Sequence, residues 1–268
     1  MLAKRIISAF IGIVIFIIFI MWNSYSFAFL TLILAYSAVI EYSNMINEIS
    51  QNKYILAIFS LFTIISIYFI NNNIINLSYG ISIFTILFIF LLYNLIFDFN
   101  NFHKKISYKF FGLVYITAGM IFLLLLRDYS TAPFNNTRAI WLVLIATWAT
   151  DTGAYFTGMI FGKKKLARNI SPNKTIEGAV GGLLLCTLVI SFYTLYLDVF
   201  SFYWFIYGIM VSFIAMAGDL FESSIKRSVG IKDTGNIIPG HGGVLDRFDS
   251  LLFSAPFTFY FIELILNT

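Results

Sequence analysis

Apolar runs of about 20 residues, separated by short polar stretches, extend along the whole chain. Because about 20 apolar residues cross a bilayer as a helix, each run is a candidate transmembrane segment. The pattern predicts an all-α, polytopic integral membrane protein with about nine transmembrane helices. The predicted runs are 6–22, 26–43, 54–71, 76–97, 108–126, 139–160, 178–197, 202–224 and 248–266.

Composition supports this class. Apolar residues make up 60% of the chain and charged residues 11%, whereas a soluble domain carries about a quarter charged residues. The run from Ile6 to Trp22 is longer than a usual signal-peptide core and no small-x-small cleavage site follows it, so we interpret it as a retained first span. Cys186, the single cysteine, lies in an apolar run and offers neither a disulfide framework nor a metal cluster.

The distribution of cations predicts the orientation in the membrane. When the runs are followed from a cytoplasmic N-terminus, all but two of the seventeen lysines and arginines fall on the cytoplasmic side; the exceptions are Arg127 and Arg138. We therefore expect a protein of the inner (cytoplasmic) membrane with its C-terminus outside. The same asymmetry explains the net charge of +4 without a nucleic-acid partner.

Ionisable residues divide the chain into two regions. Residues 1–135 read as a scaffold of about five helices with almost no ionisable groups inside the runs. Residues 136–268 read as a catalytic region of about four helices with cytoplasmic loops at 161–177 and 226–247. This second region carries Asp151, Asp219 and Glu222 at or near membrane depth, where ionisable residues are usually functional.

One helical face of the eighth run collects polar groups. Asp219, Glu222, Ser223 and Lys226 follow the i, i+3, i+4, i+7 spacing. A structural salt bridge from Asp219 to Lys226 or Arg227 is one interpretation, and a functional carboxylate is the favoured one. Asp246 and Asp249 open the ninth run, where the positive end of the helix dipole favours carboxylates. Helix capping would explain that pair alone, but facing Asp219 the pair would suit Mg²⁺.

Two loops add phosphate-binding chemistry. The turn from Pro239 to Gly243 lets backbone approach a ligand, although it is not a Walker P-loop and a plain tight loop is the alternative. Its His241 would contact phosphate or organise the loop. Lys174 lies in a Ser-Pro-x-Lys-Thr loop, where a cation and hydroxyls converge as phosphate sites require. The nearby lysines at 163–165 read mainly as membrane anchors.

These motifs resemble a known family. The run from Ser224 to Asp249, S-x-K-R-x₄-K-D-x₅-P-G-H-G-G-x-x-D-R-x-D, resembles the signature of the phosphatidate cytidylyltransferases, or CDP-diacylglycerol synthases. Upstream, the D-T-G-A-Y-F-T-G, F-G-K-x-K-L and S-P-x-K-T-x-E-G segments are similar to the same family. The resemblance covers about residues 148–250, and the first half is similar only in being apolar and of suitable length.

The resemblance implies that CTP and phosphatidate give CDP-diacylglycerol and pyrophosphate with Mg²⁺, a second cation being left open. The nucleophile, a lipid phosphate oxygen, is already anionic, so positioning and electrostatic stabilisation would carry catalysis. Asp219 and Asp246 would hold the metal and, with Lys226 and Arg227, form the catalytic set. The implied substrate-binding residues are Ser223, Ser224, Lys174, Lys232, His241, Gly242, Gly243, Arg247, Asp249 and Asp151.

The implied partners are CTP, phosphatidate and membrane lipid, at an active site on the cytoplasmic side; the family also suggests a homodimer. Two other functions compete. A CTP-dependent lipid kinase, such as a polyprenol or phytol kinase, would use a lipid hydroxyl, and the long signature argues against it. An ion-coupled transporter would spread its charges towards the midplane and often shows two similar halves, whereas here the charges gather at one face.

Overall fold

The computed structural model describes residues 2–46, 53–72, 102–238, 240 and 242–266. Their regular secondary structure is helical apart from one short β-hairpin. The chain forms two compact units. The N-terminal unit comprises Met1–Leu125 and Asp233–Leu245, and the C-terminal unit comprises Leu126–Lys232 and Asp246–Thr268. The functional division into scaffold and catalytic regions stays a prediction.

The described helices follow the predicted apolar runs, except that the fourth run, 76–97, lies outside the described residues. Seven described helices are long and apolar enough to cross a membrane, and α1 contains a shorter apolar stretch. An all-α polytopic membrane architecture fits these helices, while the count of nine and the orientation of the ends stay predictions. The helices are α1 (Leu2–Trp22), α2 (Ser24–Met45), α3 (Lys53–Asn71), α5 (Phe102–Arg127), α6 (Arg138–Phe161), α7 (Ile176–Tyr196), α8 (Phe202–Ser228) and α9 (Leu245–Leu266).

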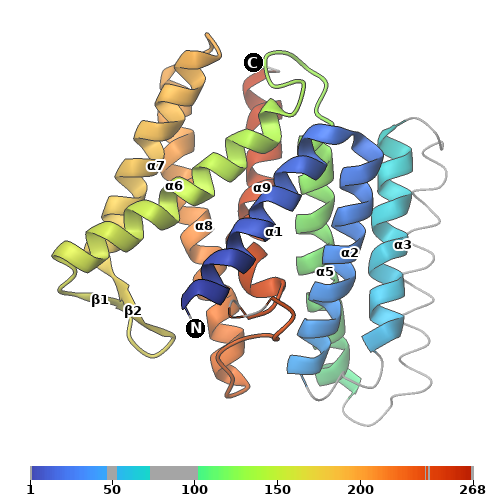
Figure 1. Cartoon of the computed structure of the whole chain (residues 1–268). Helices are drawn as coiled ribbons and strands as arrows, with labels where there is room; N and C mark the ends of the chain where they lie inside the picture. Colours follow the sequence, from blue (N-terminus) through green and yellow to red (C-terminus); the bar gives the residue numbers. More distant parts are fainter. Residues whose placement is uncertain (1, 47–52, 73–101, 239, 241, 267–268) are drawn as a thin grey trace. The chain divides into compact units, whose positions relative to one another are not determined.

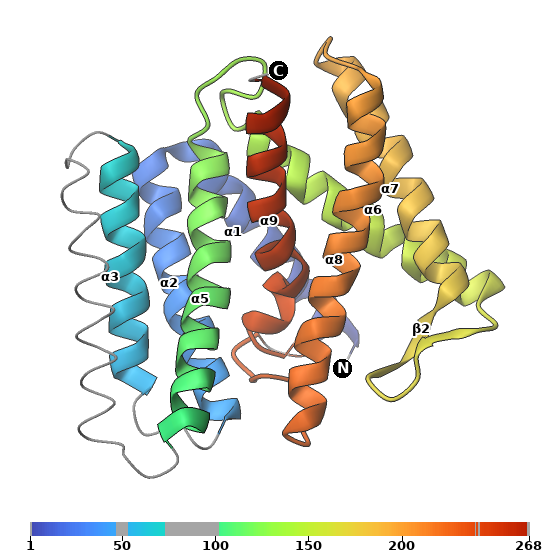
Figure 2. The same ribbon diagram turned by 180° about the vertical axis from the view of Figure 1, so that it is seen from behind.

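Helices α2, α3 and α5 lie side by side in the N-terminal unit (Figures 1 and 2). Their core includes Phe27, Leu56 and Ile116, all at most 1% exposed. A hydrogen-bonded pair of hydroxyls lies among the described residues of this core, where burial favours such pairing. The Ser60 and Thr117 hydroxyls lie 2.8 Å apart and join α3 to α5. These contacts make the unit a packed helical layer.

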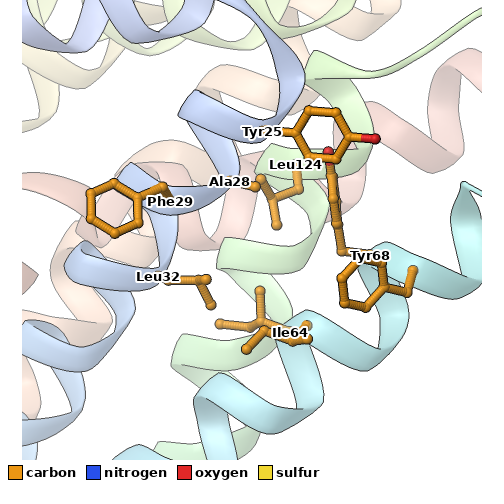
Figure 3. Close-up of a pocket in the computed structure, with 9 residues that line it drawn as sticks. Tyr25, Ala28, Phe29, Leu32, Ile64, Tyr68 and Leu124 are labelled. Atoms are coloured by element: carbon orange, nitrogen blue, oxygen red, sulfur yellow. The ribbon is translucent and has the colours of Figure 1, made fainter.

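A small apolar cavity lies in the N-terminal unit (Figure 3). Among the described residues that line it, none is charged, and Tyr25 and Tyr68 supply the only side-chain hydroxyls. The other lining residues are Ala28, Phe29, Leu32, Ile64, Ile65, Phe69 and Leu124. Such a lining suits an acyl chain or another side chain, and it offers no group for phosphate chemistry.

Glycines bring α6 and α7 together in the C-terminal unit. A Cβ on Gly182 would lie 2.8 Å from the Thr150 carbonyl oxygen, and one on Gly178 would lie 2.8 Å from the Ala154 carbonyl oxygen. The two glycines are four residues apart on α7, the small-xxx-small spacing that lets helix backbones touch in membranes. Backbone contact along this seam therefore holds α6 and α7 as one pair.

The loop between α6 and α7 adds one short β-hairpin to the predicted all-α architecture. Strands β1 (Lys165–Ala167) and β2 (Ser171–Thr175) pair antiparallel, with Lys165 opposite Thr175. Figure 1 shows the hairpin beyond the joined ends of α6 and α7. The strands are too short, and too poor in apolar residues, to leave an alternating pattern in the sequence.

Two side chains fix the hairpin to α7. The Thr175 hydroxyl caps this helix by accepting a hydrogen bond from the Gly178 N–H at 3.1 Å. The Glu177 carboxylate accepts from the backbone N–H groups of Lys163 and Lys164 at 3.0 and 3.1 Å. The lysine-rich turn is therefore held in a defined conformation at the end of α6.

Replacing Gly182 by Val should destabilise the α6–α7 pair, because the new side chain would clash with the α6 backbone at the Thr150 carbonyl. We expect a loss of about 1–3 kcal/mol, typical of overpacking. Thermal unfolding in detergent would measure it. Gly12→Val is the matched control, since a Cβ on Gly12 meets nothing within 4 Å. Equal unfolding temperatures for both variants would show that the seam is not tightly packed.

The predicted orientation can be tested on the two ends of α6. This helix has 24 residues, so at about 1.5 Å per residue it can cross the apolar layer of a bilayer. Cysteines replacing the exposed Asn169 and Asn236 should react with an impermeant thiol reagent only from the cytoplasmic side, and Ala132→Cys only from outside. The native Cys186 is buried and should give little background. Labelling of Asn169→Cys and Ala132→Cys from one side would refute the orientation.

Candidate active site

A buried lysine joins α8 to α9 at the centre of the candidate site. The Lys226 ammonium donates to the Glu222 carboxylate at 2.9 Å and to the Asp246 carboxylate at 2.7 Å. Exposed fractions of the three side chains are 10%, 0% and 5%, respectively. A charge buried to this degree is tolerated only when it is paired and hydrogen-bonded. The three residues therefore act as one structural unit, which we name the Lys226 triad.

A second ion pair is more open. Lys174 of β2 pairs with Asp219 of α8, and the exposed fractions of the two side chains are 27% and 29%. The Ser223 hydroxyl donates to Asp219 over a long 3.4 Å. The predicted alternative, in which Lys226 or Arg227 pairs with Asp219, is wrong in this structure. The β-hairpin supplies the cation, and a partly exposed pair can exchange its partners for a ligand.

Further carboxylates face this second pair. Asp151 of α6 interacts electrostatically with Asp219 and Asp249, and with the cations Lys174 and Arg247. Helices α8 and α9 approach closely, because Gly218 leaves no room for a Cβ: one would lie 2.9 Å from the Asp249 carbonyl oxygen. Acidic side chains from three helices therefore converge on one region of the C-terminal unit.

Carboxylates outnumber cations among the described residues of this region. The acidic cluster consists of the carboxylates Asp151, Asp219, Glu222, Asp246 and Asp249 with the cations Lys174, Lys226 and Arg247. One oxygen of Glu222, Oε1, is buried without a hydrogen-bond partner. No three carboxylate, imidazole or thiol groups in the described part of the chain are arranged to hold a metal by themselves. Mg²⁺ usually takes only one or two carboxylates, completed by phosphate oxygens and water. The carboxylate oxygens present are donors of the kind that suits a hard cation such as Mg²⁺.

The predicted metal ligands lie in different settings. Asp219 neighbours Asp151 and Asp249, whereas Asp246 is bonded to Lys226. Asp249 also accepts a hydrogen bond from the Ser250 N–H at 2.6 Å. The assignment of Mg²⁺ to Asp219 and Asp246 stays a prediction.

The remaining predicted phosphate-binding residues mostly hold backbone in place or lie at the surface. Arg227 donates from Nε to the Ile170 carbonyl at 3.2 Å and from Nη1 to the Ile231 carbonyl at 3.1 Å. It thereby ties the turn of the hairpin to the end of α8. The Ser224 hydroxyl donates to the Phe221 carbonyl at 2.7 Å within α8. Lys232 and Arg247 are exposed, and their roles towards phosphate stay predictions.

The glycine-rich segment has two separate reasons for its glycines. Gly240 and Gly242 adopt left-handed backbone conformations, with φ of 78° and 85°, which other residues rarely adopt. Gly243 is needed for space, since its Cβ would lie 2.4 Å from a carboxylate oxygen of Glu41 in α2. His241 lies outside the described residues. Glu41 is not among the predicted site residues, although an acidic residue inside an apolar run is itself a signal.

Seven long apolar helices among the described residues define the chain as a multi-pass membrane protein, and its C-terminal unit carries a cluster of ion pairs. Comparison with known proteins places it more closely. Residues 3–265 match the profile of the cytidylyltransferase family. The chain therefore belongs to this family.

Three bacterial relatives are named phosphatidate cytidylyltransferase. The chain is 40% identical to the Bacillus subtilis protein over 157 residues, covering 58% of each chain. It is 40% identical to the Haemophilus influenzae protein over 169 residues, which is 60% of this chain and 58% of the relative. Against the Staphylococcus aureus protein (strain COL) the identity is 43% over 148 residues, or 54% of each. The chain thus spans somewhat more than half the length of these relatives.

The Lys226 triad predicts a charge-dependent loss of stability. Lys226→Met leaves two buried carboxylates without their shared cation, and we expect a loss of about 3–5 kcal/mol. Adding Glu222→Gln removes one of the uncompensated charges and should restore part of that loss. Chemical unfolding in detergent would compare the variants. Lys164→Met, at an exposed position, should leave stability unchanged; the same result for Lys226→Met would contradict the triad.

Proposed function

We propose that this protein transfers the cytidylyl group of CTP to phosphatidate, giving CDP-diacylglycerol and pyrophosphate. The observation that carries the proposal is the open Lys174–Asp219 pair beside the Lys226 triad, within the segment that resembles the phosphatidate cytidylyltransferase signature. Family membership supports nucleotidyl transfer, and the names of the relatives support phosphatidate as the acceptor.

Catalysis of this reaction depends more on neutralising negative charge than on proton transfer. An anionic phosphate oxygen of the lipid attacks the α-phosphorus of CTP, a new P–O bond forms, and the bond to the β-phosphate breaks with its electrons leaving on pyrophosphate. No proton has to be removed from the nucleophile. The barrier comes from bringing two anions together, which fixed cations lower.

The Lys174–Asp219 pair is suited to this task. Because both side chains are partly exposed, an arriving phosphate can take the Lys174 ammonium while the Asp219 carboxylate becomes free to bind a cation. Bound Mg²⁺ would neutralise charge on the phosphates and on the departing pyrophosphate. Asp219 and Asp246 are the residues we propose to hold it.

The Lys226 triad would keep the acidic side chains in place. Lys226 is bonded to two carboxylates, so its contribution is to orient Asp246 as much as to attract phosphate. We further propose that the site opens to the cytoplasmic side of the inner membrane, where CTP arrives from water and phosphatidate from the lipid. Homodimer formation stays a prediction from the family.

The direct experiment incubates the purified protein with CTP, Mg²⁺ and micelles containing phosphatidate. CDP-diacylglycerol and pyrophosphate should appear in equal amounts and only when all three components are present. Failure of a correctly folded protein to consume CTP under these conditions would refute the proposed function.

Neutralising either proposed metal ligand should abolish most activity. Asp219→Asn and Asp246→Asn keep the side-chain size but remove the charge, and each should lower turnover by about a hundredfold or more. Their effects should not add, since both disable the same ion. The rate of CDP-diacylglycerol formation, with intact folding checked separately, would measure this.

Asp198→Asn provides the control for that comparison. Asp198 lies between α7 and α8 with a positive φ of 58°, a conformation that Asn also tolerates, so the variant should keep wild-type activity. Full activity in Asp219→Asn or Asp246→Asn would overturn the two-carboxylate assignment even if the reaction itself were confirmed.

A further inference from the structure

A buried carboxylate in the N-terminal unit holds the glycine-rich segment. Glu41 of α2 is 3% exposed. Its two carboxylate oxygens accept hydrogen bonds from the backbone N–H groups of Val244 and Leu245, both at 2.9 Å. The Thr234 hydroxyl donates to the same carboxylate at 3.3 Å. One side chain thus contacts both ends of the segment from 234 to 245.

The segment is shaped to fit around this carboxylate. A Cβ on Gly235 would lie 2.9 Å from Glu41 Oε1, and a Cβ on Gly243 would lie 2.4 Å from Oε2. Neither glycine has a left-handed φ, so close approach is what requires them: approach to Glu41 at Gly235, and to both the Thr234 hydroxyl and Glu41 at Gly243. The contact is therefore built from both sides, by a carboxylate and by two residues without side chains.

The contact also supplies the cap of a helix. α9 begins at Leu245, and the first N–H groups of a helix have no partner within it. Val244 and Leu245 are 4% and 0% exposed, so water cannot replace Glu41 as their acceptor. A negative charge at this end also complements the helix dipole.

We infer that Glu41 is a positioning residue for the reaction, because it determines where α9 begins. This inference rests on the proposed function. Asp246, a proposed metal ligand, directly follows Leu245 in the chain. If Glu41 instead held the backbone N–H groups one residue further along, the side chains of α9 would be rotated by about 100° relative to this anchor, the rotation per residue of an α-helix. Glu41 acts on Asp246 through backbone and does not touch the substrates.

The first test is Glu41→Gln, which keeps the size but removes the charge and turns one acceptor into a donor facing N–H groups. We expect faster amide hydrogen exchange at Val244 and Leu245, measured without substrates. We also expect the Mg²⁺ concentration for half-maximal rate to increase by about tenfold or more, as when the support of a metal ligand is lost. The KM for phosphatidate should stay unchanged, and Glu41→Asp, which keeps the charge, should recover part of both losses.

A double-mutant cycle isolates the contact. Gly243→Ala should mimic Glu41→Gln, because the new methyl group displaces the Thr234 hydroxyl and the Glu41 carboxylate that it bonds. The combined variant should be no worse than the single ones, since residues in contact show non-additive effects. Glu263→Gln is the matched control: it lies near the other end of α9 and accepts a 2.6 Å hydrogen bond from Tyr129. It should change neither exchange at Val244 nor the Mg²⁺ requirement.

The outcomes separate this inference from the proposed function. Unchanged exchange at Val244 and Leu245 in Glu41→Gln overturns the contact itself. Faster exchange with an unchanged Mg²⁺ requirement in an active enzyme overturns the positioning role and leaves Glu41 a structural cap. If the wild-type protein makes no CDP-diacylglycerol, the proposed function and the positioning role both fail, whereas the exchange data still decide the contact.

Discussion

A lysine buried among carboxylates is the constraint on which the candidate site depends. Lys226 lies at the end of a membrane-type helix, and its charge is tolerated there because Glu222 and Asp246 both accept from it. The bond to Asp246 joins α8 to α9. Asp219 precedes Lys226 by about two turns on the same helical face, so the position of the triad also sets the direction of Asp219. The open pair with Lys174 follows from that direction.

Glycines make this arrangement of charges possible. Gly218 lets α8 approach the α9 backbone beside Asp249, and Gly182 lets α7 approach α6 near Asp151. Larger residues would separate the helices and draw apart the carboxylates that come from different helices. Lipid provides little hydrophobic force between helices, so close packing of small residues has to hold them together. The acidic cluster therefore depends on the close helix packing that the glycines allow.

The helices and part of the candidate site could be predicted from the local pattern of residues in the sequence. Apolar runs predicted the helices because a membrane span needs a fixed length, and i, i+4 spacing predicted that Glu222 and Lys226 share a face. The partner of Asp219 could not be predicted, because Lys174 is far away in sequence and reaches α8 through a hairpin whose strands have no apolar alternation. Glu41 was missed for a related reason. Its partners include backbone N–H groups, and because almost every residue has one, the sequence does not mark which of them bind a carboxylate.

The glycine-rich turn shows the same limit. Its composition predicted close backbone approach, and the structure gives Gly243 a carboxylate of the protein itself as the group that approaches. Gly242, by contrast, is explained by its left-handed conformation. A glycine in a sequence thus indicates that space or conformation is special, while the neighbour that demands it depends on the fold.

The position of the transferred phosphorus tests the proposed chemistry most directly. The purified protein would be supplied with Mg²⁺, phosphatidate and CTP labelled at either the α- or the γ-phosphorus. Cytidylyl transfer predicts that the α-label enters the lipid fraction and the γ-label leaves as pyrophosphate. Recovery of the γ-label in lipid would indicate a lipid kinase and would contradict the proposed function.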